Sequence, residues 1–211
     1  MPNIKSIAAI LFSLFTCFLS TSSYAQNYPN KSITVIVPFS AGSASDVVTR
    51  VLLDKVSNNT GARFVFDNRP AAGGNVGTAA LVRAEPDGYT IGISTSGPLA
   101  INKILNPDLG YDPEKEIQGI AVFAFLPNVI VVSSTLNINS LAQLNDYVRK
   151  NPDVGYGSVG NGSSQHLAGA YYEQLVGAKM LHVPYRVTAN MVTDLVAGRV
   201  PTSFQLFPNV V

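Results

Sequence analysis

Two loops rich in Gly and Ser are the places where this chain could bind an anion. The first covers residues 38–46 (PFSAGSASD), and the second covers residues 160–166 (GNGSSQH). Each stands between a predicted strand and a predicted helix. The first amides of a helix have no intrahelical acceptor and its N-terminus is partly positive, so such loops favour a negatively charged ligand. For the first loop, an ordinary strand-to-helix turn with Asp46 as the helix cap is the alternative.

The segment that leads into the second loop is a formal match to the dinucleotide-binding motif. Gly155, Gly157 and Gly160 have the spacing G-x-G-x-x-G. No Asp or Glu follows about 20 residues beyond the last glycine to hold a ribose hydroxyl. A further loop at 68–75 places glycines before a helix but lacks the Gly-Lys-Ser/Thr of a phosphate-binding loop. We therefore expect no nucleotide and no other cofactor.

The two histidines, His166 and His182, are the only ones that a catalytic triad or a histidine metal site could use. They lack the spacing of metal ligands, and no Gly-x-Ser-x-Gly elbow is present. His166 falls in the first turn of a predicted helix, where a hydrogen-bonded structural role is the usual one. We expect no metal site, no catalytic residue and no enzyme. A secreted hydrolase that uses Ser163 or Ser164 with His166 is the alternative from the enzyme class.

The segments around these loops alternate between strand and helix patterns, which predicts an α/β fold with parallel sheets. The expected strands are 33–37, 63–66, 89–94, 154–158 and 179–183. The expected helices are 46–54, 75–84, 140–150, 164–176 and 189–197, the third capped by Asn139 or Ser140 and the last by Gly198. An apolar stretch at 119–132 joins the two series. Two α/β units joined in this way predict a two-lobed protein with a cleft.

Residues 1–25 have the three regions of a secretory signal peptide. Lys5 supplies the positive charge, residues 7–19 are mostly apolar, and small residues precede the expected cut after Ala25. The apolar run is shorter than the roughly 20 residues that span a bilayer. We expect a periplasmic mature chain that begins at Gln26 and has no stable membrane insertion.

The cysteine content and the net charge exclude further classes of site and partner. Cys17 is the only cysteine, and it lies inside the apolar signal region rather than at the cleavage point of a lipoprotein. The mature chain then has no cysteine for a disulfide or a thiolate metal site. The net charge is +1 and no run of Lys or Arg occurs, so the electrostatic footprint of a nucleic-acid binder is absent.

A series of ordered motifs resembles one family along the whole mature chain to about Gly198. The motifs are Tyr28-Pro, Pro38-Phe with Gly42 and Asp46, Asn68-Arg-Pro-x-x-Gly-Gly-Asn-x-Gly77, Pro86-Asp-Gly-Tyr-Thr90, Tyr111-Asp-Pro, Pro127-Asn-Val, Gly157-Ser-x-Gly-Asn-Gly-Ser-x-x-His-Leu167, His182-Val-Pro-Tyr185 and Thr193-Asp-Leu. In order and spacing they resemble the Bug/TctC extracytoplasmic receptors of tripartite tricarboxylate transporters.

That resemblance implies a periplasmic-binding-protein type II-like fold, with a first lobe at 26–128 and a second at 129–211. It implies a non-enzymatic protein that captures a small carboxylate and delivers it to the membrane permease subunits of a transporter. Two loops would grip the ligand carboxylate. The residues expected to bind it are Phe39, Ser40, Gly42, Ser43, Ser45, Asp46, Gly160, Asn161, Gly162, Ser163, Ser164 and His166.

Several positions depart from the family pattern. Ser43 stands where a second Gly is usual, and it could add a donor or block a backbone with positive φ. Residues 186–188 (RVT) replace a usual Lys and two glycines, and Gln205 replaces a common acidic residue. In the family the chain also returns to complete the first lobe. We therefore expect a C-terminally shortened relative with an incomplete first lobe, and a degenerate member without binding activity is the alternative.

Overall fold

A computed structural model of the chain describes residues 28–210. From Lys31 onward these residues form one compact unit. The predicted signal peptide and its cleavage site lie outside the described residues. In the part of the chain that the structure describes, no helix has the length and apolar character needed to cross a membrane.

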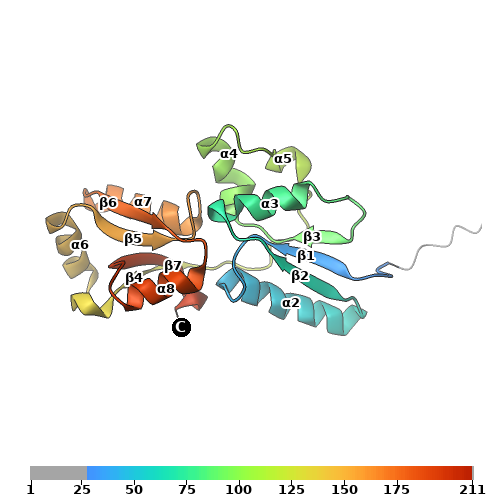
Figure 1. Ribbon diagram of the computed structural model, residues 1–211, viewed down its shortest axis with the longest axis horizontal. Coiled ribbons are helices and arrows are strands. Elements are labelled where there is room, and N and C mark those ends of the chain that lie inside the picture. The colour runs from blue at the N-terminus through green and yellow to red at the C-terminus, as the bar shows by residue number, and fades with distance from the viewer. Residues whose placement is uncertain (1–27, 211) are drawn as a thin grey trace, which may run out of the picture. The chain divides into compact units, whose positions relative to one another are not determined.

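The first sheet has three parallel strands in the order β2-β1-β3. They are β1 (Ile33–Val37), β2 (Phe64–Asn68) and β3 (Thr90–Gly92), and their main covering helices are α2 (Ala44–Thr60) and α3 (Asn75–Val82). Figure 1 shows the two helices on opposite sides of the sheet. Because both faces are covered, the central strand is apolar except for Thr34, and its fully buried Val35 and Val37 pack with Leu53 of α2.

Short helices and an extended segment connect the two sheets. They are η1 (Ala72–Gly74), η2 (Gly97–Ile101), α4 (Asn102–Leu105) and α5 (Pro113–Glu116). Residues 117–127 have no regular structure. The side chains of Ile120 and Phe125 in this segment are 83% and 91% exposed.

The second sheet is mixed, in the order β4-β7-β5-β6. Its strands are β4 (Asn128–Val132), β5 (Val154–Ser158), β6 (Met180–Pro184) and β7 (Thr202–Leu206), with β4 antiparallel to β7 and the other pairs parallel. Its helices are α6 (Leu141–Lys150), α7 (Ser164–Val176) and α8 (Thr188–Val196), with short turns η3 (Ser134–Leu136) and η4 (Phe207–Asn209). Tyr156, Tyr172 and Phe204 pack together in its core.

The predicted α/β fold is confirmed, with differences at the ends of elements. The first helix runs to Thr60 rather than to residue 54, and Ser43 is its N-cap, so the expectation that Asp46 caps it is wrong. The last helix has its C-cap at Ala197, and Gly198 follows with φ of 74°. The division into lobes at 26–128 and 129–211 stays a prediction.

Candidate ligand-binding site

The two predicted loops are built in the same way at the point where each helix begins. Ser43 caps α2 with φ −69° and ψ 159°, and Ser163 caps α7 with φ −69° and ψ 158°. Gly42 and Gly162, the residues before the caps, have φ of 75° and 73°, a left-handed backbone that glycine adopts without a steric cost. Ser43 needs no positive φ, so it serves as a helix cap in place of the family's usual second glycine.

Asp46 holds the first loop from inside. Its side chain is 2% exposed, and its two oxygens accept hydrogen bonds from the Gly42 amide (2.9 Å), the Arg50 Nε (2.9 Å) and the Asn68 Nδ2 (2.9 Å). Burial acts to raise the pKa of Asp46, but the hydrogen bonds from Arg50, Asn68 and Gly42 outweigh it and hold that pKa below its ordinary value. The Asp46 carboxylate is therefore ionised and holds the shape of the first loop.

The second loop is held by its own serine and histidine side chains. Ser163 Oγ donates to the Gly160 carbonyl (2.7 Å) and accepts from the His166 amide (3.2 Å). The Gly162 amide donates to Nδ1 of His166 at 3.2 Å. His182 lies behind the loop, with Nε2 2.5 Å from the Ser158 Oγ. The imidazole rings of the two histidines are 4.2 Å apart between centroids.

Burial shifts both histidines toward the neutral form. It lowers the pKa of His166 below its ordinary value, although the negative charge of Glu173 opposes the shift. Burial, with the neighbouring His166, lowers the pKa of His182 to about 4. Both rings are therefore uncharged at neutral pH.

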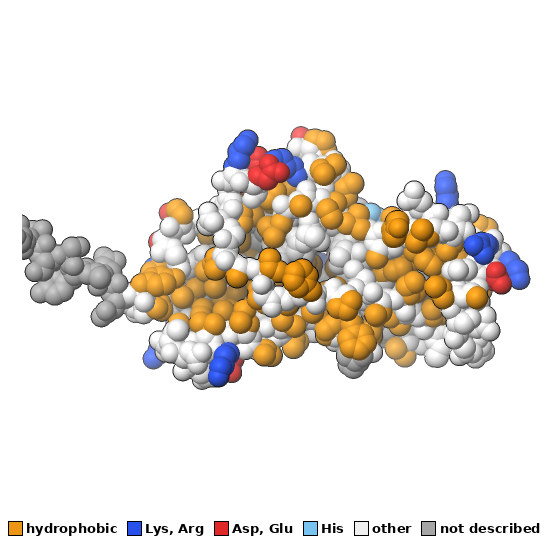
Figure 2. Space-filling view, turned by 180° about the vertical axis from the view of Figure 1, so that it is seen from behind, with side chains coloured by type: hydrophobic (Ala, Val, Ile, Leu, Met, Phe, Trp, Pro, Cys, Tyr) orange, Lys and Arg blue, Asp and Glu red, His pale blue; other side chains and the backbone are white. Residues whose placement is uncertain are grey.

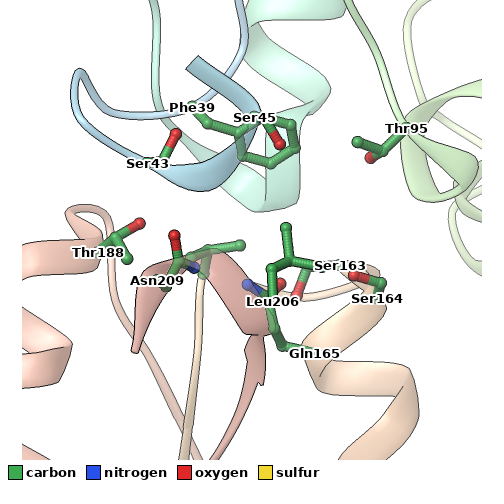
Figure 3. A pocket seen from close by; sticks show the side chains of 11 residues that line it. Phe39, Ser43, Ser45, Thr95, Ser163, Ser164, Gln165, Thr188, Leu206 and Asn209 are labelled. Carbon is green, nitrogen blue, oxygen red and sulfur yellow. The ribbon is translucent and has the colours of Figure 1, made fainter. Parts of the chain in front are cut away.

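The two loops line one cavity of about 20 Å³, which Figure 3 shows from close by. Its walls are formed by Phe39, Ser43, Ser45, Thr95, Val159, Ser163, Ser164, Gln165, Thr188, Leu206 and Asn209. None of these side chains is charged, and most carry a hydroxyl or an amide. In Figure 3, Phe39, Ser43 and Ser45 lie on one side of the cavity and face Ser163, Thr188 and Asn209 on the other.

Hydrogen bonds across the cavity connect the first sheet's loops to those of the second. The Ala44 amide donates to Oδ1 of Asn209 at 2.7 Å. Ser40 Oγ lies 3.3 Å from the Thr188 Oγ1 and accepts from the Thr188 amide at 3.3 Å. A cavity of about 20 Å³ holds about one water molecule, so a larger ligand requires these contacts to open.

The structure brings five of the predicted site residues to the cavity wall. They are Phe39, Ser43, Ser45, Ser163 and Ser164. The others lie behind the wall or at its edge: Ser40 bonds to Thr188, Asp46 and His166 hold the loops, and Gly160, Asn161 and Gly162 pack closely against η1 and α4. Gly42 supplies the turn before the first cap. Whether all of these residues bind a ligand stays a prediction.

Sequence reasoning missed several residues that line the cavity. They are Thr95, Val159, Gln165, Thr188, Leu206 and Asn209, and four of them, Thr95, Thr188, Leu206 and Asn209, lie far from both loops along the chain. Of the departures from the family pattern, the segment 186–188 brings Thr188 to the wall. Gln205 is fully buried, and its Oε1 accepts a hydrogen bond from Nδ2 of Asn209 (3.2 Å). No local sequence pattern marks Asn209 as a residue of this cavity.

The hydrogen bonding of the serines does not favour hydrolysis. Ser163 Oγ is occupied as a helix cap, and Nδ1 of His166 already accepts a backbone amide. Ser158 and His182 form a closer pair, but Ser158 is fully buried and His182 has a pKa of about 4, which makes it a weak base. Within residues 28–210, no three His, Cys, Asp or Glu side chains group so that they could hold a metal ion.

Comparison with known proteins agrees with this geometry. Residues 48–210 match the family model of the tripartite tricarboxylate transporter family receptor, TctC. The chain belongs to the TctC family. A UPF0065 protein of Pseudomonas sp. strain P51 is 34% identical over 205 residues, which cover 94% of this chain and 61% of that protein. The chain thus spans about three fifths of the length of this TctC relative.

Solved structures share the fold. One described as the structure of a periplasmic transporter has 36% identity and a TM-score of 0.83, over 86% of this chain and 61% of that one. Rpa4515 of R. palustris, solved with adipate, has 33% identity and a TM-score of 0.83, over 87% of this chain and 62% of that one. The predicted resemblance to periplasmic binding proteins of the TctC type is confirmed.

Proposed function

We propose that this chain is an extracytoplasmic solute-binding protein that captures a small carboxylate. The observation that carries the proposal is the pair of matching Gly-Ser caps, at α2 and α7, on one uncharged cavity lined by hydroxyls and amides. The dicarboxylate adipate bound to the structurally similar R. palustris protein supports the same ligand class.

The first-turn amides of α2 and α7 would supply the donors. Such amides have no acceptor within their own helix, and each lies at the partly positive end of its helix. The hydroxyls of Ser45 and Ser164 line the same cavity. A hydrogen bond to a charged group contributes about 1.5 to 3 kcal/mol, so a few of them suffice for micromolar affinity without Lys or Arg.

Asn209 accepts a hydrogen bond from one of these amides in the structure. Its carboxamide oxygen accepts the Ala44 amide, which is the first amide of α2. A carboxamide oxygen has the same trigonal geometry as a carboxylate oxygen but no charge. A ligand carboxylate would therefore displace Asn209 as the acceptor of this amide.

Ligand entry requires the two sheets to separate around the cavity. The closed cavity has room for about one water molecule, whereas a dicarboxylate is several times larger. Opening breaks the Ala44–Asn209 and Ser40–Thr188 hydrogen bonds, and closure on the ligand replaces them with bonds to the carboxylate. Phe39 at the cavity wall would cover the apolar part of the ligand.

Isothermal titration of the mature chain against adipate, succinate, citrate and acetate tests this function. We expect at least one carboxylate to bind with micromolar affinity and the neutral diamide of adipate not to bind. Circular dichroism of the same sample checks that the chain is folded. A folded sample that binds no carboxylate would point instead to a degenerate family member.

The proposal extends to location and partners. We expect delivery of the solute to the membrane permease subunits of a tripartite transporter, as the family name implies. We expect the protein in the periplasm after cleavage behind Ala25. Mass spectrometry of the periplasmic fraction should find a chain that begins at Gln26, and a species that keeps Met1 and occurs only in the cytosol would contradict export.

A further inference from the structure

The two histidines behind the second loop hold that loop through hydrogen bonds, although neither lines the cavity. His166 on α7 accepts the Gly162 amide, and His182 on β6 bonds to Ser158, whose Oγ in turn accepts the Gly160 amide at 3.0 Å. Each imidazole thus holds one turn of the loop, directly or through Ser158. The rings contact each other at 4.2 Å between centroids.

We propose that His166 and His182 are positioning residues that hold this loop in its ligand-binding shape, and that protonation of His166 releases it. The inference rests on the proposed carboxylate binding. Its geometric basis is that Nδ1 of His166 is an acceptor only while the ring is neutral. A protonated ring presents a second donor to the Gly162 amide, and the buried amide then loses its partner.

The two histidines differ in what protonation does to them. Nε2 of His182 faces a hydroxyl, which can donate to a neutral ring or accept from a protonated one by rotating. His166 faces a backbone amide, which can only donate. Protonation therefore breaks the hydrogen bond of His166 and reverses that of His182. His166 is the acid-sensitive member of the pair.

Burial is the main reason that both rings are neutral at neutral pH, and the surrounding titratable groups act in different directions. Glu173, on the same helix as His166, favours its charged form, but burial outweighs that effect. His182 faces His166 from β6, and two imidazole rings 4.2 Å apart disfavour a charge on both. Tyr156 of β5 stacks on His182 at 5.1 Å, and burial with the charge of Glu173 raises its pKa to about 12, so it stays neutral.

The test measures adipate affinity at pH 7.5, 6.5 and 5.5 in the mature chain and in two variants. His166→Gln keeps an acceptor that does not titrate, and His166→Phe keeps an aromatic ring without an acceptor. At pH 7.5 we expect the affinity to fall at least tenfold in His166→Phe and less in His166→Gln. Between pH 7.5 and 5.5 the natural chain should lose more affinity than His166→Gln, and the difference should grow with each step down in pH. Protonation of adipate affects both proteins equally and cancels in that comparison.

His182→Phe separates the two roles. It removes the acceptor for Ser158 but leaves His166 in place, so binding should weaken at pH 7.5 while the pH profile stays as in the natural chain. The proposal is overturned if His166→Gln keeps the natural pH profile or if His166→Phe binds as tightly as the natural chain. A flat profile in His182→Phe alone would likewise overturn it.

A second readout needs no ligand. Hydrogen exchange of the Gly162 amide should be protected in the natural chain and in His166→Gln, and unprotected in His166→Phe. If no carboxylate of the panel binds the natural chain at pH 7.5, the proposed function fails, and this protection pattern still decides whether His166 holds the loop. Equal protection in all three proteins would refute the positioning role.

Discussion

Asn209 is the residue through which the account predicts the clearest change in ligand affinity. Its carboxamide oxygen accepts the Ala44 amide at 2.7 Å, so Asn209→Asp places a tethered carboxylate on that amide, where it competes with the ligand. We expect adipate affinity to fall at least tenfold, because a charge-assisted hydrogen bond contributes about 1.5 to 3 kcal/mol. Titration calorimetry at pH 7.5 measures this.

Two matched variants isolate the cause. Asn209→Ala frees the Ala44 amide without adding a charge, so it should bind adipate at least as tightly as the natural chain. Asn190→Asp makes the same charge change at an exposed position on α8 and should leave the affinity unchanged. If Asn209→Asp and Asn209→Ala bind equally well, Asn209 does not occupy the carboxylate position.

The histidine pKa values also predict how folding stability depends on pH. Both pKa values are lowered in the folded chain, that of His182 to about 4, from an ordinary value of 6.5. The unfolded chain then binds more protons between these values, so the free energy of unfolding should fall as the pH drops from about 6.5 to about 4. Urea denaturation across this range measures the slope. Replacing both histidines with Gln should flatten it, and a slope that survives the double replacement would contradict this origin.

For single residues, the sequence predicted which residues could donate hydrogen bonds to a ligand. It did not predict Asn209, which accepts one of those hydrogen bonds in the structure. Ser43, Ser45, Ser163 and Ser164 could be identified because Gly-Ser segments before helices have a local signature. Asn209 reaches the cavity through a tertiary arrangement, and no local pattern marks it. The expected cap at Asp46 was wrong because Ser43 caps the helix, and the Asp46 carboxylate accepts hydrogen bonds from Arg50 of the same helix and from Asn68 at the end of β2.

Among the elements, the start of α7 is where small changes should matter most. Gly162 has φ of 73°, and a Cβ added there would clash with the side-chain oxygen of Asn102. Gly162→Ala should therefore disrupt the loop and abolish adipate binding. Gly177, at the other end of the same helix, has φ of 66°, and a Cβ added there would have nothing within 4 Å. Gly177→Ala should cost about 1 kcal/mol of stability from backbone strain alone and leave binding intact.

Chemical denaturation and titration calorimetry on the two variants separate strain from site geometry. Ser163→Ala gives an intermediate reference, because loss of an N-cap costs about 0.5 to 2 kcal/mol. Binding that survives Gly162→Ala would show that the second loop is not part of the site.

The elements that the sequence predicted well are those with a strong local period. The strands 33–37 and 154–158 and the helix 164–176 have the bounds that were expected. The strand β7 was missed because three of its five residues are polar, and Ser203 and Gln205 are fully buried although polar residues are expected on a solvent face. Its pairing with β4 joins segments about 70 residues apart, and single-segment patterns carry no information on such pairings.

For the whole molecule, the connection between the two sheets presents the most exposed apolar side chains. Ile120, Val122 and Phe125 are 83%, 76% and 91% exposed on a segment without regular structure. Figure 2 shows apolar side chains gathered across one face of the protein, with charged groups confined to a few places on it. Contiguous exposed apolar surface favours association.

We therefore predict that the chain self-associates through this segment. The double variant Ile120→Ser, Phe125→Ser should be more monomeric than the natural chain in sedimentation velocity at micromolar concentration. Ile104→Ser, which removes an equally exposed apolar side chain from α4, should change the distribution less. Equal association in all three proteins would assign it to another surface.

The central claim is that the starts of α2 and α7 bind the same ligand carboxylate. The most direct measurement is the titration of ¹⁵N-labelled protein with adipate, followed by the amide resonances of Ala44, Ser45 and Ser164. The account predicts that all three shift together along one binding curve, and that the neutral diamide of adipate shifts none of them. If adipate binds but moves the resonances of only one helix, or of neither, the two-loop site is contradicted.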